Sequence, residues 1–219
     1  MTLSIVIPVF NEATQLPETL ARLAALRARG VQVIVVDGGS TDGTARVAGV
    51  EWLQSAPGRA RQMNAGAARA RGEALLFLHA DTHLPAEADR LIAQALDTLH
   101  WGRFDVRIAG RPRLLALVAF MMNLRSRLTG IATGDQGIFV RRSTFESLGG
   151  YADLPLMEDI ELSARLRRVS PPACLKGPAI TSGRRWESRG PWRTIFLMWR
   201  LRWAYWRGVP ASRLAEEYR

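Results

Sequence analysis

The chain has 219 residues, of which 47% are hydrophobic; this is enough for one sizeable core, and we expect a single domain over residues 1–219. A single cysteine, Cys174, excludes an internal disulfide framework and is typical of a reducing compartment. The formal net charge of +10 makes anionic lipids, nucleic acids and phosphorylated substrates candidate partners. Because residues 1–9 lead directly into a strand pattern, without a charged and then apolar leader, we expect a cytoplasmic protein.

Strand and helix patterns alternate through the first hundred residues. In chain order they are a strand at 3–9, a helix from about Pro17 to Gly30, a strand at 31–36, a short helix after the glycine-rich turn 38–43, a strand at 50–54, a helix at 59–70, a strand at 74–78 and a helix at 86–99. The strands are short apolar runs of the kind that a sheet buries on both faces. This order predicts an α/β fold in which a mostly parallel sheet has helices on both faces.

The second half of the chain is less regular. Its predicted elements are strands at 103–108 and 137–141 and helices at 114–124, 158–169 and 192–207. The apolar run 114–124 is too short to cross a bilayer, since its eleven residues give about 16 Å against a hydrocarbon core of about 30 Å. Arginines interrupt the last helix, and we expect residues 190–219 to form a basic, aromatic helical extension.

Carboxylates stand where predicted strands end. Asp37 closes the strand 31–36, Asp81 follows the strand 74–78, and Glu158-Asp159 opens a later helix. In open α/β sheets, ligands bind beyond the carboxyl ends of the strands. Carboxylates placed there can hold a divalent metal, a sugar hydroxyl or a base edge, so the pattern indicates an enzyme that acts on a nucleotide-linked substrate.

Six short segments resemble, in the right order, the motifs of family 2 glycosyltransferases with the GT-A fold. They are residues 4–12 (SIVIPVFNE), 36–44 (VDGGSTDGT), 58–66 (GRARQMNAG), 77–82 (FLHADT), 134–142 (GDQGIFVRR) and 157–159 (MED). The residues in these segments are similar to those of small, stand-alone, non-processive bacterial members of the family. The resemblance runs from residue 4 to about residue 187. It implies a Rossmann-like, three-layer GT-A sandwich that moves a sugar from a nucleotide-diphosphate donor, with inversion and with a metal ion.

The resemblance assigns the first two motifs to the donor, most often a uridine diphosphate sugar. Asp37 would hydrogen-bond the base, beside glycines that let the backbone approach a ligand closely. The alternative is that this carboxylate only caps the next helix. The other residues implied to line the pocket are Pro8, Phe10, Asn11, Glu12 and Gly38. For Asn11, a local Asx turn is an equally good explanation.

Arginines in two segments are candidates for binding the donor's diphosphate, because the guanidinium fork suits phosphate oxygens. In the third motif Arg61 is favoured over Arg59, with surface charge as the alternative for both. Arg185-Trp186 resembles the end of the Gln-x-x-Arg-Trp motif of processive relatives, but Ser182 stands where glutamine would be, which argues against a processive polymerase. We expect Arg185 to contact the diphosphate and Trp186 to contact the acceptor.

His79-Ala80-Asp81 occupies the place of the family's Asp-x-Asp metal motif, without its first aspartate. Mg²⁺ and Mn²⁺ prefer oxygen ligands, so Asp81 is the expected ligand. His79 and His83 are further candidate ligands, and packing at the strand end explains either histidine equally well. The metal would bridge the diphosphate and neutralise charge on the departing nucleotide.

Glu158-Asp159 resembles the family's Glu-Asp pair, whose aspartate acts as general base. Asp159 would take the proton of the acceptor hydroxyl as that oxygen attacks the anomeric carbon, with Glu158 beside it in the catalytic pair. The alternative is that both acids interact with the helix dipole at its start. Asp135 and Gln136 precede a predicted strand in a loop that we expect beneath the sugar or the acceptor, with turn chemistry as the alternative.

The end of the chain is basic and aromatic. From Arg184 onward it holds nine arginines, three glutamates and five of the seven tryptophans. Helical spacing places one stripe on the last predicted helix: Trp192, Ile195, Phe196, Trp199, Trp203 and Trp206. Packing on the domain or on a partner subunit is the more frequent use of such a stripe. The alternative is contact with the inner face of the cell membrane, with 114–124 as a second contact, which would suit a lipid-linked acceptor.

Two other functions fit part of the pattern. A nucleotidyltransferase would build a similar sheet but needs a glycine-rich loop with a basic residue directly after the first strand, and residues 8–12 (PVFNE) have neither. A non-enzymatic module that binds membrane or nucleic acid leaves the strand-end carboxylates unexplained, because they repel phosphates without a metal. We therefore expect a glycosyltransferase without a nucleic-acid partner, and the sugar, the acceptor and the oligomeric state stay open.

Overall fold

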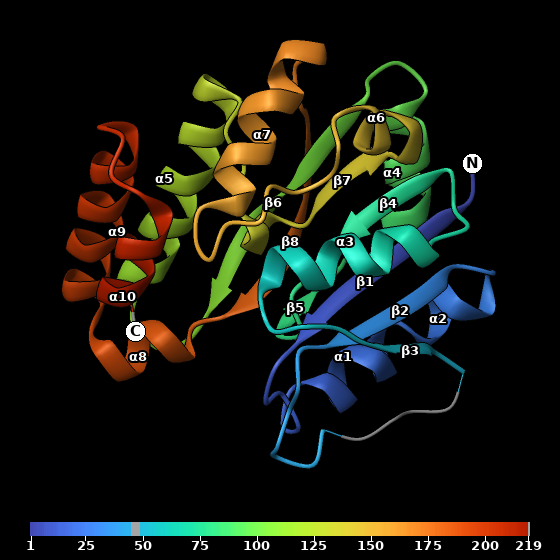
Figure 1. Ribbon diagram of the computed structural model, residues 1–219, viewed down its shortest axis with the longest axis horizontal. Helices are drawn as coiled ribbons and strands as arrows, with labels where there is room; N and C mark the ends of the chain where they lie inside the picture. Colours follow the sequence, from blue (N-terminus) through green and yellow to red (C-terminus); the bar gives the residue numbers. More distant parts are fainter. Residues whose placement is uncertain (45–48, 219) are drawn as a thin grey trace.

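The computed structural model describes residues 1–44 and 49–218, apart from the side chain of Arg185. Over these residues the strands form one mixed sheet in the order β3-β2-β1-β4-β7-β6-β8-β5 (Figure 1). The sheet thus contains both the parallel strands that the sequence predicts and antiparallel strands that it does not.

The first half of the sheet is parallel. Its strands are β1 (Leu3–Val9), β2 (Gln32–Asp37), β3 (Glu51–Gln54) and β4 (Ala74–Phe77). β1 pairs with β2 on one side and with β4 on the other, and Val9 lies opposite Asp37 in the register. The apolar runs are buried because helices cover both of their faces. The carboxyl ends of β1 and β2 therefore finish level at one edge of the sheet.

The second half of the sheet departs from the mostly parallel arrangement. Its strands are β5 (Thr82–His83), β6 (Trp101–Ala109), β7 (Ile138–Arg141) and β8 (Ala173–Ser182). β7 runs antiparallel to both β4 and β6, and β5 runs antiparallel to β8, whereas β6 and β8 are parallel. Because of this direction, Ile138 at the start of β7 lies opposite Phe77 at the end of β4. The turn just before β7 is thereby placed beside the carboxyl end of β4.

Helices cover both faces of the sheet, as predicted. One face carries α1 (Leu16–Arg22), α2 (Ala24–Ala28) and α4 (Ala88–Leu96), and the other carries α3 (Arg59–Arg69), α6 (Arg142–Ser147) and α7 (Glu158–Val169). Side chains of β1 alternate between the two cores, with Ile5 in the first and Val6 in the second. α1 and α2 replace the single helix predicted up to Gly30. The helix predicted after 38–43 falls on residues outside the described part.

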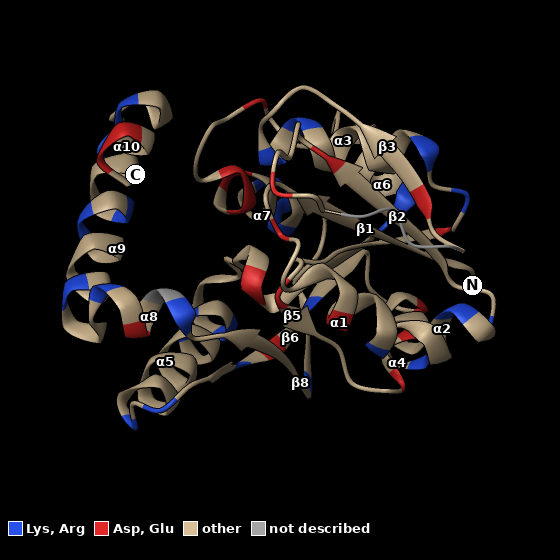
Figure 2. Ribbon diagram, turned by 90° about the horizontal axis from the view of Figure 1, so that it is seen from below, with Lys and Arg blue, Asp and Glu red and all other residues tan. Residues whose placement is uncertain are grey.

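Further helices lie at one end of the sheet (Figures 1 and 2). They are α5 (Leu114–Thr129), α8 (Arg184–Arg189), α9 (Pro191–Trp206) and α10 (Ala211–Tyr218). α5 packs against β6, and α9 and α10 pack through Leu201 and Leu214 against Met157, which precedes α7. Among the described residues, no helix is both long enough and apolar enough to cross a bilayer.

Candidate functional site

A cavity of about 460 Å³ opens beyond the carboxyl ends of β1 and β4. Its walls come from segments far apart in the chain: the ends of these strands, the turn before β7, the start of α7, and α8 to α10. The residues predicted for the site that line it are Pro8, Glu12, His79, Asp81, Asp135, Glu158, Asp159 and Trp186. Figure 2 shows acidic positions in red where the strands meet the start of α7, and basic positions in blue along α8 and α9. The cavity thus brings carboxylates and cations together at the edge of the sheet.

Asp159 is held at the cavity by two backbone donors. The N–H of Gly134 donates to its Oδ2 at 2.9 Å, and the N–H of Ile160 donates to its Oδ1 at 2.7 Å. Burial and, after it, the neighbouring carboxylate of Glu158 together raise the pKa of Asp159 from 3.8 to about 6, against the effect of these donors. A carboxylate with a pKa near 6 is still ionised at neutral pH and is a stronger base than an exposed one. This geometry suits a general base.

Glu158 is buried, and its Oε1 lies 3.4 Å from a guanidinium nitrogen of Arg59, which also lines the cavity. Arg61, the arginine favoured by sequence, pairs instead with Asp153 at 2.8 Å in an exposed position and is not among the residues that line the cavity. The two arginines are two positions apart on α3, so they face different directions. The structure therefore brings Arg59, rather than Arg61, to the predicted catalytic pair.

The end of β4 and the turn before β7 interlock. His79 Nδ1 lies 3.3 Å from Asp135 Oδ1, and both residues line the cavity. A Cβ at Gly134 would overlap Nε2 of His79, so any other residue at this position would displace the His79 ring. Gln136 is buried and closes a capping box with Thr133, which leaves it outside the lining of the cavity.

Asp81 and Glu12 are the carboxylates that line the cavity just beyond the ends of β4 and β1. Burial raises the pKa of Glu12, Asp81 raises it further, and Arg184, whose guanidinium is 3.6 Å away, lowers it. Among the described residues, no group of three His, Cys, Asp or Glu side chains could by itself hold a metal ion. Mg²⁺ usually binds through one or two carboxylates together with substrate phosphates, so the donor set here suits a metal that arrives with a diphosphate.

His83 lies apart from the cavity. Its Nε2 is 3.9 Å from Glu18 of α1, and it lines a separate small cavity against α1. Burial lowers the pKa of His83, as does nearby Arg22. Of the two predicted histidines, the structure therefore places His79 with Asp81 in the larger cavity.

The remaining donor residues form the loops after β1 and β2. Asp37 Oδ1 accepts hydrogen bonds from the N–H of Gly39 and from the N–H and hydroxyl of Ser40. Asn11 joins the two loops, because its N–H donates to Ser40 Oγ and its Oδ1 accepts from Thr41 N–H. Glu12 of the first loop lines the cavity, whereas Asn11, Asp37 and Ser40 do not. Two of the predicted donor residues are also there: Phe10 is 55% exposed, and Gly38 packs against Gln62.

Two residues near the cavity have a strained backbone conformation. Among the described non-glycine residues, Asn11 and Met157 have positive φ angles, of 56° and 70°. Asn11 follows β1, and Met157 directly precedes the predicted catalytic pair, Glu158-Asp159, that opens α7. Such backbone conformations are costly for L-residues and are concentrated at functional sites.

Several lining residues were not found from the sequence. They come from α8 to α10 and include Arg184, Met198, Leu201, Arg202 and Tyr218. Trp186, which the sequence assigns to the acceptor, lines the cavity and also packs against the core beneath α5. The side chain of Arg185 lies outside the described part of the structure. The aromatic spacing of the last helix predicted an amphipathic helix, but it carried no signal that the opposite face would close the site.

Known proteins share the sequence and the fold. Residues 4–113 match the family model described as Glycosyl transferase family 2. The chain is 32% identical over 198 residues to an uncharacterized glycosyltransferase of Mycobacterium tuberculosis, covering 80% of this chain and 72% of that protein. It is 30% identical over 161 residues to the undecaprenyl-phosphate 4-deoxy-4-formamido-L-arabinose transferase of Shewanella sediminis, covering 63% of this chain and 46% of that protein.

Among solved structures, the fold is similar to that of the mannosyltransferase PcManGT from Pyrobaculum calidifontis in complex with GDP-Man and Mn²⁺. The TM-score is 0.62 at 22% identity, and the match covers 92% of this chain and 60% of that chain. The chain therefore spans less than two thirds of the length of this protein and of the Shewanella sediminis relative.

Proposed function

The chain belongs to glycosyl transferase family 2, and from this premise we propose that it transfers a sugar, with inversion, from a nucleotide-diphosphate donor to a hydroxyl group of an acceptor. One observation carries the proposal: a single cavity holds Asp81 from the end of β4 and Asp159 from the start of α7. Transfer needs one group that removes the acceptor proton and one that manages the charge of the leaving diphosphate. Asp159 would supply the first function, and Asp81 would supply the second by holding a divalent metal ion in the same cavity.

In this proposal the loops after β1 and β2 bind the nucleotide. The three hydrogen bonds to Oδ1 of Asp37 fix the orientation of the carboxylate. None of the described residues hydrogen-bonds Oδ2, and we assign this oxygen to the base of the nucleotide. Pro8 and Glu12 carry the donor site from these loops into the cavity. A uridine diphosphate sugar is the donor that we would test first, with a guanosine diphosphate sugar second because PcManGT was solved with GDP-Man.

Asp81, with His79 beside it, would hold Mg²⁺ or Mn²⁺ on the donor side of the cavity. When bound, such an ion stabilises negative charge on the departing diphosphate. The solved complex of PcManGT with Mn²⁺ supports a divalent metal. Arg59 and Arg184 add fixed positive charge to the same cavity.

Asp159 then acts as the base on the acceptor side. Its carboxylate is oriented by the Gly134 and Ile160 amides and would take the proton as the acceptor oxygen attacks the anomeric carbon in line with the leaving diphosphate. Asp135 and Trp186 line the cavity where the acceptor would lie. A lipid-linked acceptor is our first choice, supported by the undecaprenyl-phosphate relative.

A ligand panel tests the proposal. Thermal unfolding would be measured with uridine and guanosine diphosphate sugars, each with and without Mn²⁺, because a ligand bound only by the native state raises the melting temperature. We expect one donor to raise it in the presence of Mn²⁺ and Asp81→Ala to remove that shift. Release of nucleoside diphosphate on adding acceptor would support transfer. Formation of pyrophosphate from a nucleoside triphosphate and a sugar phosphate, in a separate assay, would instead indicate a nucleotidyltransferase, and no shift with any nucleotide would contradict the proposal.

A further inference from the structure

The last long helix exposes a row of aromatic side chains. Its members are Trp192, Phe196, Trp199, Trp203 and Trp206, and their side chains are between 60% and 80% exposed. At about 100° per residue they fall within about 80° of one another around α9. Large apolar side chains that are gathered on one exposed face usually mark an interaction site.

This row is not the face that holds α9 to the protein. The helix packs through its other side, where Thr194 and Leu201 are buried and Leu197 and Met198 contact the core around Met157. Of the stripe predicted from the sequence, Ile195 is the half-buried member. Packing on the domain therefore explains why the helix is where it is, and it leaves the five aromatics unexplained.

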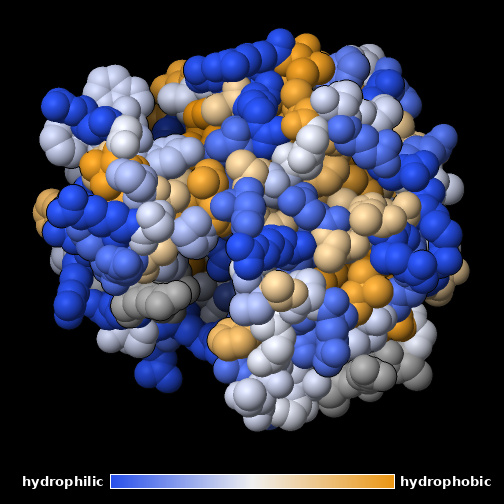
Figure 3. Space-filling view, in the orientation of Figure 1, coloured by the Kyte–Doolittle hydropathy of each residue, from blue (hydrophilic) through white to orange (hydrophobic). Residues whose placement is uncertain are grey.

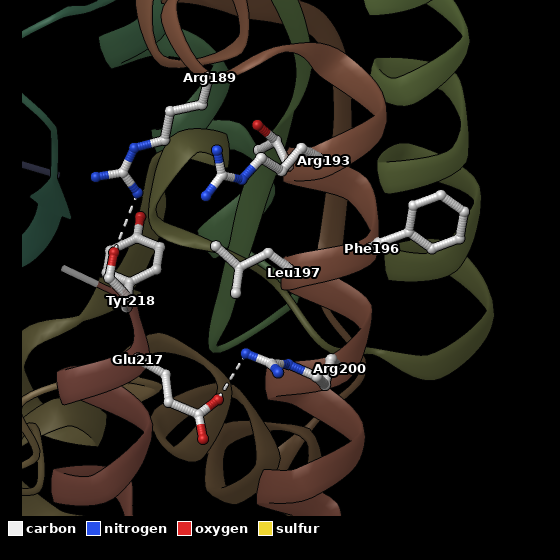
Figure 4. Close-up of a pocket in the computed structure, with 8 residues that line it drawn as sticks. Arg189, Arg193, Phe196, Leu197, Arg200, Glu217 and Tyr218 are labelled. Atoms are coloured by element: carbon white, nitrogen blue, oxygen red, sulfur yellow. Dashed lines mark hydrogen bonds and ion pairs between the residues drawn. The ribbon is translucent and has the colours of Figure 1, made fainter.

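α5 exposes a second apolar row. Its members are Leu117, Phe120, Met121, Leu124 and Leu128, which are between 37% and 77% exposed. Both ribbon views place α5 and α9 at the same end of the molecule (Figures 1 and 2). In the close-up, Phe196 extends from α9 away from the α10 side (Figure 4). We call these two rows together the α5–α9 surface.

Arginines border the aromatic row on both sides. By helical position, Arg193, Arg200 and Arg207 follow one edge, and Arg202 follows the other. Arg207 lies over the ring of Trp203, 5.3 Å from its centroid. In the space-filling view, the end formed by α9 and α10 shows hydrophobic residues between strongly hydrophilic ones (Figure 3). A Trp row with an arginine edge is the composition of helices that lie in the headgroup region of a bilayer.

The arginine edge also lines a cavity between α9 and α10. This cavity measures about 540 Å³, and Arg189, Arg193 and Arg200 surround it with one acid, Glu217 (Figure 4). Arg200 pairs with Glu217 at 2.8 Å, and Arg189 donates to the backbone carbonyl of Tyr218. The side chains that line the cavity are net cationic, so its charge complements an anionic headgroup.

We propose that the α5–α9 surface docks on an anionic lipid bilayer, with the aromatic and aliphatic rows at the interface and the arginine edge against lipid phosphates. Charge selects this partner over a second copy of the chain, because a symmetric contact would bring like-charged arginine edges together. It also selects anionic over neutral lipid. This surface is independent of the chemistry proposed for the cavity of Asp81 and Asp159.

Docking would set the position of that cavity. The inner face of α9 contributes Met198 and Leu201 to its wall, and Arg202 reaches the wall from the border of the aromatic row on the outer face. A helix with its side chains is about 10–12 Å across, so the site would lie about one helix diameter from the headgroups. An acceptor whose lipid stays in the membrane could then present its polar end to the cavity.

Vesicle co-sedimentation of the whole chain tests the proposal. We expect binding to phosphatidylcholine vesicles that contain phosphatidylglycerol, much weaker binding to pure phosphatidylcholine, and release by salt. Trp199→Ser/Trp203→Ser should lower the affinity by about tenfold or more, because it removes interfacial tryptophans. Arg193→Gln/Arg200→Gln should lower it by about tenfold on anionic vesicles and have little effect on neutral ones.

Matched controls lie outside the surface. Val169→Ser changes an exposed apolar residue at the end of α7, and Arg90→Gln changes an exposed arginine that, like Arg200, is paired with a glutamate. Both should bind as the wild type does. Light scattering without vesicles tests whether a second copy of the chain binds this surface instead. A dimer that dissociates in the Trp199→Ser/Trp203→Ser variant would overturn the proposal. The proposal would also be overturned if the wild-type protein did not bind anionic vesicles, or if the tryptophan variant bound them with wild-type affinity.

Discussion

The two halves of the chain reach the cavity in different ways. Residues of the first half, such as Glu12 and Asp81, follow parallel strands whose position is fixed by the sheet. Residues of the second half lie on a turn and at a helix start instead. Asp159 is held by the backbone amides of Gly134 and Ile160, and Asp135 lies against His79. In the proposed function, the donor side is therefore built on sheet hydrogen bonds, and the acceptor side on individual contacts between loops that single substitutions can disturb.

The largest expected effect is on the acceptor side. Asp159→Asn keeps the size of the side chain but removes the base, and we expect kcat to fall by about 10²- to 10⁴-fold. Donor affinity, measured by calorimetry, should stay near the wild-type value because the donor side is held by the sheet. Asp97→Asn, an exposed site at the end of α4, serves as the control. Equal loss of donor binding and turnover would show that Asp159 supports the whole cavity rather than one step.

The matching test on the donor side is Asp81→Ala. We expect the metal-dependent gain in donor affinity to fall by about 100-fold, since a metal ion that neutralises a diphosphate contributes several kcal/mol. Titration with Mn²⁺ at fixed donor concentration measures it. His79→Ala should have a smaller effect, and His83→Ala the smallest, because His83 lies against Glu18. An Mn²⁺ titration that is the same for Asp81→Ala and wild type would contradict the metal assignment.

The same division explains how much of the fold the sequence predicts. The strands 3–9, 31–36 and 74–78 are unbroken apolar runs, and β1, β2 and β4 occupy nearly the same residues. The helix predicted at 158–169 matches α7. β8 was missed because Lys176, Gly177 and Pro178 interrupt its pattern. The antiparallel direction of β7 leaves no trace in periodicity, since a strand of four residues reads alike in either direction.

The site divides in a similar way. Residues tied to strand ends and helix starts could be predicted, because sheet geometry alone brings such positions to one edge. Those on α8 to α10 could not, because their place depends on how the terminal helices pack around Met157. Choosing between Arg59 and Arg61 required knowing which side of α3 faces the cavity. Spacing within a motif does not contain that information.

Substitutions of the two arginines of α3 are expected to have effects of intermediate size on transfer. Arg59→Gln should reduce transfer by about tenfold, since hydrogen bonds to charged groups contribute about 1.5–3 kcal/mol and Glu158 would lose its cation. Arg61→Gln should have a smaller effect because its partner Asp153 is exposed. Arg59→Lys, which keeps the charge, should restore part of the activity. A larger loss at Arg61 than at Arg59 would favour the original motif-based assignment.

The pH dependence of transfer is expected to be no larger than the effect of Arg59→Gln. Asp159 must be ionised to act as base, and its pKa is about 6, so kcat/KM should fall about tenfold between pH 7 and pH 5. The sign for stability is opposite. Because the folded-state pKa lies above the ordinary 3.8, the folded state favours the neutral carboxyl, and the contribution of Asp159 to stability decreases as the pH rises from about 4 to 6.

Glu12 provides the control for this profile, because burial and Asp81 raise its pKa as well. If Asp159 controls the dependence of kcat/KM on pH, Glu12→Gln lowers kcat/KM without changing the pH at which it falls on the acid side (the acid limb). Activity profiles of wild type and Glu12→Gln from pH 5 to pH 8 separate the two carboxylates, and thermal unfolding on the same samples checks that the activity lost at low pH is not lost through unfolding. An acid limb that disappears in Glu12→Gln would move the titrating group from the acceptor side of the cavity to the donor side.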